Sequence, residues 1–351
     1  MPVVNISETG KLIAPHAAQE PSGLSKHILI GYWHNWHNPS APFLRLTGVP
    51  DAFDVINVAF AVPSKAGTGE IVFTPHKAIS IDEFKEDVLH VQRRGKKVLI
   101  SIGGAAGSME IEDVPARHNF VDSISTLIRE YNFDGIDINL EGRVKLEEGD
   151  RDFRNPTSPG ILHLIQAIRE IRNNFPPDFI LSMAPETVNV QAGLVTYSGL
   201  SGSYLPLIHN LREVLTWLQV QHYNSGPLVA LDRNTYFPGT ADFHVATAEM
   251  LLNGFPVMAN SQAVFPPLKP GQVVIGAAAI PTAVDNGHTA PLELQRALDY
   301  LTRGNPFGGS YIRQSAENYF SLRGVMTWSI NWDIANGRQF SNSIHSYLNN
   351  I

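Results

Sequence analysis

Residues 134 to 141 read Asp-Gly-Ile-Asp-Ile-Asn-Leu-Glu and carry the side chains whose spacing best suits chemistry in this sequence. Asp137, Asn139 and Glu141 alternate with aliphatic residues, and in an extended strand this period of two puts the three polar groups on one face. A protein interior tolerates such a face only where it opens onto water or a ligand, because an unpaired buried carboxylate is costly. The stretch therefore predicts a strand that ends in a site where a carboxyl group acts as a general acid.

The elements that must position this strand follow from a pattern that recurs along the chain. Eight apolar runs end in small or polar residues: His27–Trp36, Asp54–Ala61, Lys97–Gly104, Phe133–Glu141, Phe179–Glu186, Trp217–Asn224, Val273–Ala279 and Val325–Trp332. Helical periodicity marks segments between them: Ile81–Arg94, Ala116–Tyr131, Ile161–Asn174, Val245–Leu252, Leu292–Leu301 and Ser315–Leu322.

Strands that alternate with helices predict a parallel sheet. Eight such units predict an α/β fold, a single-domain (β/α)8 TIM barrel with its site at the carboxyl ends of the strands. An open doubly wound sheet is the alternative, but no Gly-x-Gly-x-x-Gly follows the first run.

The composition excludes several classes of protein. The 351 residues are 43% hydrophobic and 17% charged, and no apolar run approaches the ~18 residues of a membrane span, which argues against a membrane protein. A net charge of -7 without a dense cluster of Lys and Arg argues against a nucleic-acid partner. The absence of cysteine excludes disulfides and a cysteine nucleophile. Residues 1–26 predict an extended leader that lacks the features of a secretory signal peptide, and residues 27–351 predict the barrel.

The stretch from 134 to 141 resembles the Asp-x-x-Asp-x-Asp-x-Glu signature of glycoside hydrolase family 18, the chitinases and their endo-β-N-acetylglucosaminidase relatives. Asp134, Asp137 and Glu141 match three of its four positions, and Asn139 stands where the family has aspartate. The resemblance implies a secreted enzyme without cofactor or metal that works by substrate-assisted, retaining catalysis. In that reaction the nucleophile is the carbonyl oxygen of the substrate's own 2-acetamido group, and the enzyme supplies one acid that later acts as base.

By this resemblance Glu141 is the acid and then the base, Asn139 orients the acetamido group, and Asp137 supports Asn139. Asp134 is expected to be a structural member at the start of the strand and part of the substrate-binding set. Tyr223, near the end of the sixth run, matches the tyrosine whose hydroxyl binds the acetamido carbonyl as it attacks.

The remaining expected substrate contacts lie at the ends of other runs. Trp328 matches the eighth-strand tryptophan on which the cleaved sugar stacks, since sugar C–H groups pack on an indole face. Met183 is expected to wall the pocket, and Gly103 and Gly104 are expected to permit close approach of the backbone. The set is completed by Tyr32, Ser101, Gln221 and Asn224.

Other residues allow more than one interpretation. Three further tryptophans are either sugar platforms or core residues: Trp33, Trp36 and Trp217. Glu186 is either a loop anchor or a ligand contact. His34 and His37 have a His-x-x-His spacing but no third ligand in view, so no metal site is expected. The charged run at 145–152 predicts a solvated loop.

The leading interpretation is an endo-acting chitinase that hydrolyses β-1,4-linked N-acetylglucosamine polymers. Residues 280–324, between the last two runs, are too few for the insertion that deepens the cleft of processive relatives, so we expect an open groove. Asn139, either native or engineered, is expected to slow hydrolysis or favour transfer to a sugar acceptor. The alternatives are an endo-β-N-acetylglucosaminidase acting on N-glycans and a non-catalytic chitin-binding protein. The expected partner is chitin or a chito-oligosaccharide, and the expected state is a monomer.

Overall fold

Eight parallel strands close into a barrel in the computed structural model, which describes residues 17–105 and 109–351. In chain order they are β1 (Ile28–His34), β2 (Val55–Pro63), β4 (Lys97–Gly103), β5 (Gly135–Asn139), β6 (Ile180–Met183), β7 (Trp217–Gln221), β12 (Val273–Ala278) and β13 (Gly324–Trp328). The same order runs around the barrel, and β13 pairs with β1 to close it. The predicted (β/α)8 barrel is therefore confirmed.

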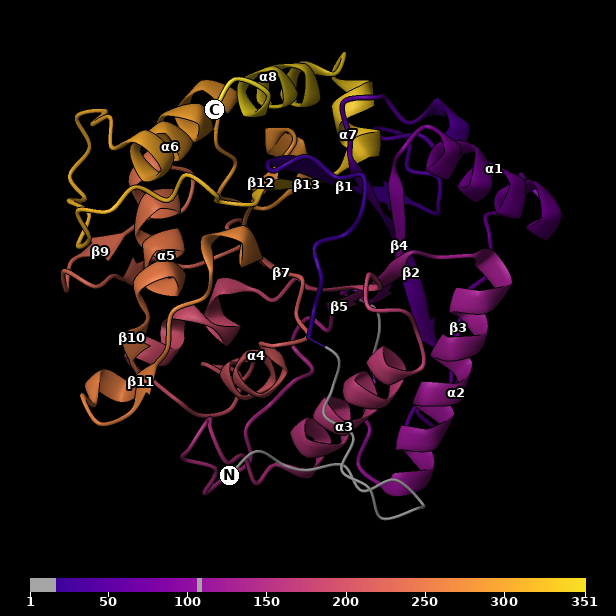
Figure 1. Cartoon of the computed structure of the whole chain (residues 1–351), viewed down its shortest axis with the longest axis horizontal. Helices are drawn as coiled ribbons and strands as arrows, with labels where there is room; N and C mark the ends of the chain where they lie inside the picture. The colour runs from indigo at the N-terminus through magenta and orange to yellow at the C-terminus, as the bar shows by residue number, and fades with distance from the viewer. Residues whose placement is uncertain (1–16, 106–108) are drawn as a thin grey trace.

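Helices surround the strands, as Figure 1 shows. They are α1 (Ile81–Arg93), α2 (Val114–Tyr131), α3 (Pro159–Asn173), α4 (Leu205–Leu211), α5 (Ala241–Asn253), α6 (Pro291–Arg303), α7 (Ile330–Ala335) and α8 (Gln339–Leu348). Helices α4, α7 and α8 lie outside the segments for which the sequence predicts helices. The connection after β1 holds only the short 3-10 helix η1 (Leu46–Gly48) where the barrel pattern would place a full helix.

The predicted helix at Ser315–Leu322 is wrong, because this segment is irregular. Its start is held by the buried carboxylate of Glu249 on α5, which accepts the N–H groups of Gln314 (2.8 Å) and Ser315 (3.1 Å). The hydroxyl of Tyr311 donates to the same carboxylate at 2.7 Å. A buried carboxylate that takes up backbone N–H groups from a distant part of the chain outweighs a local helical pattern.

The connection from β12 to β13, residues 279–323, lies wholly within the described part of the chain and contains α6, the 3-10 helix η6 (Pro281–Ala283) and no strand. A large insertion between the last two barrel strands is therefore absent, as predicted.

The short elements elsewhere are β3 (Ile71–Val72), β8 (Leu228–Val229), β9 (Thr235–Tyr236), β10 (Phe255–Pro256), β11 (Val264–Phe265), η2 (Thr187–Asn189), η3 (Gln191–Leu194), η4 (Val257–Ala259) and η5 (Pro270–Gln272). No helix among the described residues is long and apolar enough to cross a membrane.

Side chains of the barrel strands alternate between two cores. One set fills the barrel interior, where Ile30 and Leu99 are fully buried. The other set packs between the sheet and the helices and includes Ile100 and Ile138. Because Ile138 faces the helices, its neighbours on β5 point into the barrel, as the period of two predicts.

Residues 17–26, the described part of the predicted leader, cross the amino-terminal end of the barrel. The N–H of Ala18 donates to the carbonyl of Glu213 at 2.6 Å, just before β7. Glu20 pairs with the buried guanidinium of Arg323 at 2.5 Å, just before β13, and Leu24 packs against the interior core. This segment thus covers the end of the barrel opposite the carboxyl ends of the strands. Residues 1–16 of the predicted leader lie outside the described residues.

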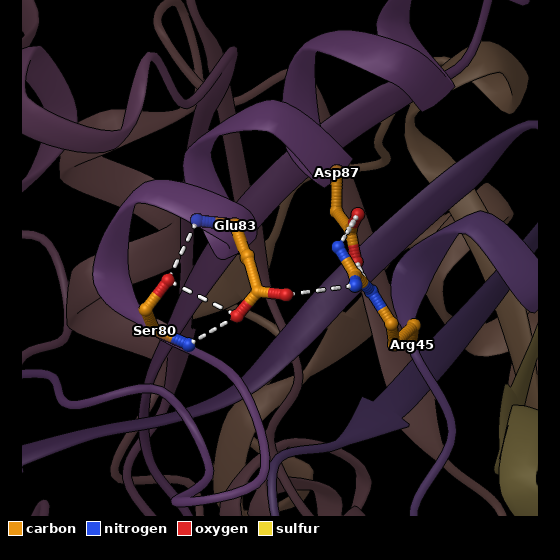
Figure 2. Close-up of polar contacts among 4 residues, drawn as sticks. All are labelled: Arg45, Ser80, Glu83 and Asp87. Carbon is orange, nitrogen blue, oxygen red and sulfur yellow. Dashed lines mark hydrogen bonds and ion pairs between the residues drawn. The ribbon is translucent and has the colours of Figure 1, made fainter.

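A capping box starts α1 beside the connection that lacks a full helix (Figure 2). The Ser80 hydroxyl accepts the N–H of Glu83 at 3.2 Å, and the Glu83 carboxylate accepts the N–H of Ser80 at 2.8 Å. Arg45, next to η1, donates to both carboxylate oxygens of Asp87 at 2.9 and 2.7 Å. These contacts tie the first connection of the barrel to its first helix.

Ser80→Ala removes the acceptor for the Glu83 N–H, and we expect the free energy of unfolding to fall by about 0.5–2 kcal/mol. Ser80→Gly is the matched control and should lower it by only roughly a few tenths of a kcal/mol, because glycine suits the N-cap backbone. Urea unfolding followed by circular dichroism measures both variants. An unchanged free energy of unfolding for Ser80→Ala would show that the serine hydroxyl does not stabilise the start of α1.

Candidate active site

A fully buried carboxylate lies at the centre of the barrel. Asp137 on β5 accepts hydrogen bonds from the hydroxyls of Tyr32 (2.6 Å), Ser101 (2.7 Å) and Ser182 (2.8 Å) and from Gln219 Nε2 (2.9 Å). These donors come from β1, β4, β6 and β7. Burial raises the pKa of Asp137, and the four hydrogen bonds oppose that shift because they stabilise the ionised form. Tyr32 and Ser101 thus contact Asp137 inside the barrel.

Asn139 lies two residues further along the same face of β5, toward the carboxyl end, and is 2% exposed. Its side-chain oxygen accepts from Gln221 Nε2 at 3.1 Å. The same nitrogen lies 3.1 Å from Glu141 Oε1 and 3.0 Å from the Ala184 carbonyl. Gln221 has two amide hydrogens for these three acceptors, so it links Glu141 and Asn139 through a shared donor.

The preferred orientation of the Asn139 amide depends on the proton of Glu141. In the orientation that accepts from Gln221, the Asn139 oxygen also faces Glu141 Oε1, a contact that is favourable only when Glu141 carries a proton. In the reversed orientation Asn139 Nδ2 donates to Glu141 Oε1 at 3.1 Å and to the Ala184 carbonyl at 3.2 Å, which suits ionised Glu141. The same nitrogen then lies 3.1 Å from Gln221 Nε2, so the Gln221 amide must turn its oxygen toward Asn139. The amide therefore offers a partner to either form of the carboxyl group.

Glu141 follows β5 and is partly exposed to the cavity at the carboxyl ends of the strands. Burial raises its pKa, the hydrogen bond from Gln221 opposes that shift, and the negative charge of Glu186 raises the pKa further. A raised pKa keeps the carboxyl group protonated closer to neutral pH, which a general acid requires.

The cavity has a volume of about 480 Å³. Its lining in the described part of the chain comprises Asn35, Trp36, Ala59, Phe60, Val62, Gly103, Ala105, Glu141, Gln221, Tyr223, Asn224 and Trp328. Glu141 is the only acidic residue among these lining residues. Burial, together with the nearby charge of Glu141, raises the pKa of Tyr223, so its phenol keeps its proton.

One wall of the cavity is formed by Trp36, Phe60 and Trp328, here named the aromatic wall. The rings of Phe60 and Trp328 lie 5.9 Å apart at 11°, and those of Trp36 and Phe60 lie 6.1 Å apart at 24°. His34 stacks on Trp36 at 4.5 Å and 8°. Burial lowers the pKa of His34 to about 4, so this imidazole is neutral at neutral pH. Flat apolar rings of this kind suit the C–H faces of sugars.

The glycine pair after β4 allows the backbone to approach its neighbours closely. A Cβ on Gly103 would lie 2.4 Å from the Asn139 carbonyl oxygen, and one on Gly104 would lie 2.6 Å from the Phe60 ring. Both glycines have positive φ, +112° and +69°. The Gly104 N–H also donates to the Asn139 carbonyl at 2.7 Å. Side chains at these positions would displace the end of β5 or the aromatic wall.

The structure corrects the expected substrate contact at Asp134. This residue precedes β5, at the end of the strand opposite Glu141. Its carboxylate accepts the N–H of Val98 and the side chain of Gln92, both at 2.8 Å, and pairs with Lys97 at 3.4 Å. These contacts fit the other expectation, a structural member at the start of the strand.

The structure also contradicts the expectation that Met183 lines the pocket. On β6 the inward positions are Ser182 and Ala184, so Met183 points into the core between sheet and helices. Trp33 and Trp217 are fully buried and lie in the outer and inner cores respectively.

Several residues of the site lie beyond the sequence predictions: Ser182, Gln219, Phe60 and Ala184. Alternation along the sixth run, in which Gln219 precedes Gln221 and Tyr223 at intervals of two, signals that Gln219 faces inward. No comparable sequence signal marks Phe60.

The charged run at 145–152 is less solvated than predicted. Leu146 is buried, and the buried carboxylate of Asp150 accepts hydrogen bonds from the hydroxyl of Ser158 at 2.6 Å and from the N–H of Thr157 at 3.0 Å.

The histidine pair near the end of the first run has a spacing that could start a metal site. His34 Nε2 forms a hydrogen bond with the hydroxyl of Ser329 at 2.7 Å. Across residues 17–105 and 109–351, no group of three or more metal-ligating side chains could hold an ion.

Comparison with known proteins gives consistent matches along the chain. The family model described as glycosyl hydrolases family 18 matches residues 28–292. Chitinase D of Niallia circulans is 49% identical over 333 residues, which are 94% of this chain and 63% of that protein. Exochitinase 1 of Streptomyces olivaceoviridis is 43% identical over 350 residues, which are 95% of this chain and 58% of that protein.

A crystal structure of a family GH18 chitinase from Chromobacterium violaceum is similar to this fold, with a TM-score of 0.85 at 37% identity over 93% of this chain and 84% of that chain. The chain spans less than two thirds of the length of the two relatives named above. The family model, however, covers most of the barrel. The chain belongs to the glycosyl hydrolases of family 18.

Proposed function

We propose that this chain is a chitinase that cleaves β-1,4 bonds between N-acetylglucosamine units by substrate-assisted, retaining catalysis. Glu141 gives its proton to the glycosidic oxygen as that bond breaks, while the 2-acetamido carbonyl oxygen bonds to the anomeric carbon. Water then opens the resulting oxazolinium ion and returns a proton to Glu141. Tyr223 binds the acetamido carbonyl, Asn139 orients the group, and Trp328 stacks against the sugar.

The observation that carries this proposal is the solitary carboxyl group in the cavity. Glu141 is the only acidic residue among the described residues of the lining, and its pKa is raised chiefly by burial. A retaining enzyme with its own nucleophile needs a second carboxylate about 5–5.5 Å from the acid, facing the sugar. A lining with one acid instead favours a nucleophile supplied by the substrate. Family membership and the relatives named as chitinases support the same substrate class.

Asn139 sets this site apart from the family signature. A neutral amide can hold the acetamido N–H through its oxygen, but it brings no negative charge to the oxazolinium cation. Loss of one such stabilising group commonly costs about 2.7–4 kcal/mol of barrier, roughly a hundred- to a thousandfold in rate. We therefore propose slow hydrolysis with a larger share of transfer to sugar acceptors.

We further propose an endo-acting, extracellular enzyme that works as a monomer. The short connection from β12 to β13 adds no subdomain to the rim of the cavity, which favours an open groove that accepts internal bonds. Action outside the cell follows from the substrate, because an insoluble polymer cannot enter.

Glu141→Gln should abolish hydrolysis of chito-oligosaccharides and leave their binding within about tenfold, since the amide keeps the shape but cannot donate the proton. Turnover is followed by product chromatography, and binding by calorimetry. Glu148→Gln, an exposed change in the following loop, is the control for the loss of one carboxylate. Turnover by Glu141→Gln comparable to that of the parent would remove Glu141 from the role of acid.

Chito-hexaose should yield products from several internal bonds in the first turnovers, because the groove is open at the rim. Its fully deacetylated counterpart should not be cleaved, since it lacks the acetamido nucleophile. Mass spectrometry of early time points distinguishes the products. Almost exclusive release of dimers would contradict the endo mode, and equal cleavage of the deacetylated chain would contradict substrate assistance.

Asn139→Asp should raise the hydrolytic rate by roughly ten- to a thousandfold, which corresponds to about 1.4–4 kcal/mol of transition-state stabilisation. Binding should change little. The variant should also form fewer elongated oligomers at high substrate concentration, because water competes better when the cation is stabilised. An unchanged rate and an unchanged ratio of transfer to hydrolysis would show that the asparagine is fully compensated.

A further inference from the structure

Two buried histidines lie side by side behind the end of β7. His222, the residue between Gln221 and Tyr223, and His244 on α5 have their Nδ1 atoms 2.9 Å apart. Their rings stack at 5.2 Å and 25°. Burial lowers the pKa of both imidazoles, that of His244 to about 3, so both are neutral at neutral pH. The hydrogen bond between the two Nδ1 atoms therefore contains a single proton.

Two buried threonines complete this cluster and set the direction of its hydrogen bonds. Thr247 Oγ1 donates to the Phe243 carbonyl at 2.6 Å and lies 3.3 Å from His222 Nε2, so it accepts from that nitrogen. His222 Nδ1 then has no proton and accepts from His244 Nδ1. His244 Nε2 in turn accepts from the hydroxyl of Thr289, which lies 2.7 Å away. The hydrogen bonds thus run in one direction, from Thr289 to the Phe243 carbonyl.

Thr289 lies in the connection from β12 to α6, and this connection covers the backbone of Tyr223. A Cβ on Gly287 would lie 2.8 Å from Tyr223 Cα, so the two segments pack without an intervening side chain. The N–H of Asn224 donates to the Asn286 carbonyl at 3.0 Å. Thr289, two residues after Gly287, therefore ties the segment that lies across Tyr223 to the histidine pair.

Tyr223 is thus held from two sides by the same cluster. His222 fixes the chain directly before it, because its N–H donates to the Gly276 carbonyl on β12 at 3.0 Å and its imidazole is anchored on α5. Thr289 fixes the segment that covers it. None of the four cluster residues lies among the described residues that line the cavity, so the cluster acts on a ligand only through the backbone that it holds.

We propose that the cluster of His222, His244, Thr247 and Thr289 positions Tyr223 for the acetamido group of the substrate, with Thr289 as the positioning residue that joins the two segments. The proposal rests on the function proposed above, because it takes Tyr223 as the group that binds the acetamido carbonyl. A displacement of about 1 Å in such a group can cost roughly a hundredfold in rate. Since the cluster touches no sugar, its loss should slow the reaction more than it weakens binding.

The test compares Thr289→Val, which removes the hydroxyl and keeps the side-chain shape, with Thr289→Ser, which keeps the hydroxyl. Thr289→Val should lower kcat on a soluble chito-oligosaccharide by about ten- to a hundredfold and leave KM within about threefold, because Tyr223 acts as the carbonyl attacks. Thr289→Ser should stay near the parent. Thr302→Val is the matched control: Thr302 is also buried, on α6, and its hydroxyl donates to the Leu298 carbonyl at 2.7 Å. This control should leave kcat unchanged.

A double-mutant cycle with Tyr223→Phe separates positioning from a general loss of structure. If Thr289 acts through the Tyr223 hydroxyl, Thr289→Val should lower kcat by less than about threefold once that hydroxyl is absent. Thermal melting shows whether each variant folds, and Thr289→Ala takes the place of Thr289→Val in the cycle if the valine variant does not fold.

The same ten- to hundredfold loss in the Tyr223→Phe background, or an unchanged kcat for Thr289→Val, would overturn the proposal. Full turnover by Tyr223→Phe would instead overturn the role of Tyr223 in the proposed function, so the two failures are distinguishable.

Discussion

The burial of one carboxylate, Asp137, is the constraint on which the site depends. A charged group in the middle of a barrel is tolerated only when its oxygens accept hydrogen bonds. Here hydroxyl and amide groups from four other strands donate these bonds. Each donor must sit at an inward position at one level of the barrel. The hydrogen bonds of Asp137 therefore fix the register of the strands whose ends carry the reactive groups.

Above this buried level, the site is built mainly from neutral amides. Gln221 contacts Asn139, Glu141 and Ala184, and Asn139 presents either its oxygen or its nitrogen to Glu141. Neutral dipoles can adapt to a proton that moves, but they stabilise a cation less than a carboxylate does.

The sequence suffices to predict the barrel and the strand of the acid, because alternation and spacing are local properties of the chain. It also predicts that Gly103 and Gly104 permit close approach of the backbone beside the site. It does not yield contacts that depend on long-range packing. The backbone N–H groups of residues 314 and 315 donate to the carboxylate of Glu249, and these contacts outweigh a local helical pattern. The alternation of side chains along β6 points Ser182, and not Met183, into the barrel interior. Phe60 packs with the interior set because the pairing of β2 with β4 shifts between Ala59 and Ala61, so that the consecutive residues Ala59 and Phe60 both belong to this set.

The aromatic wall has a consequence for the conditions under which the protein can hold a ligand. Its rings carry no charge, and the imidazole stacked behind them is neutral above about pH 4. Attraction between such rings and an uncharged sugar involves no ion pairs, so dissolved salt does not screen it. Retention of a glycan on this surface should therefore be as strong in seawater or brine as in fresh water.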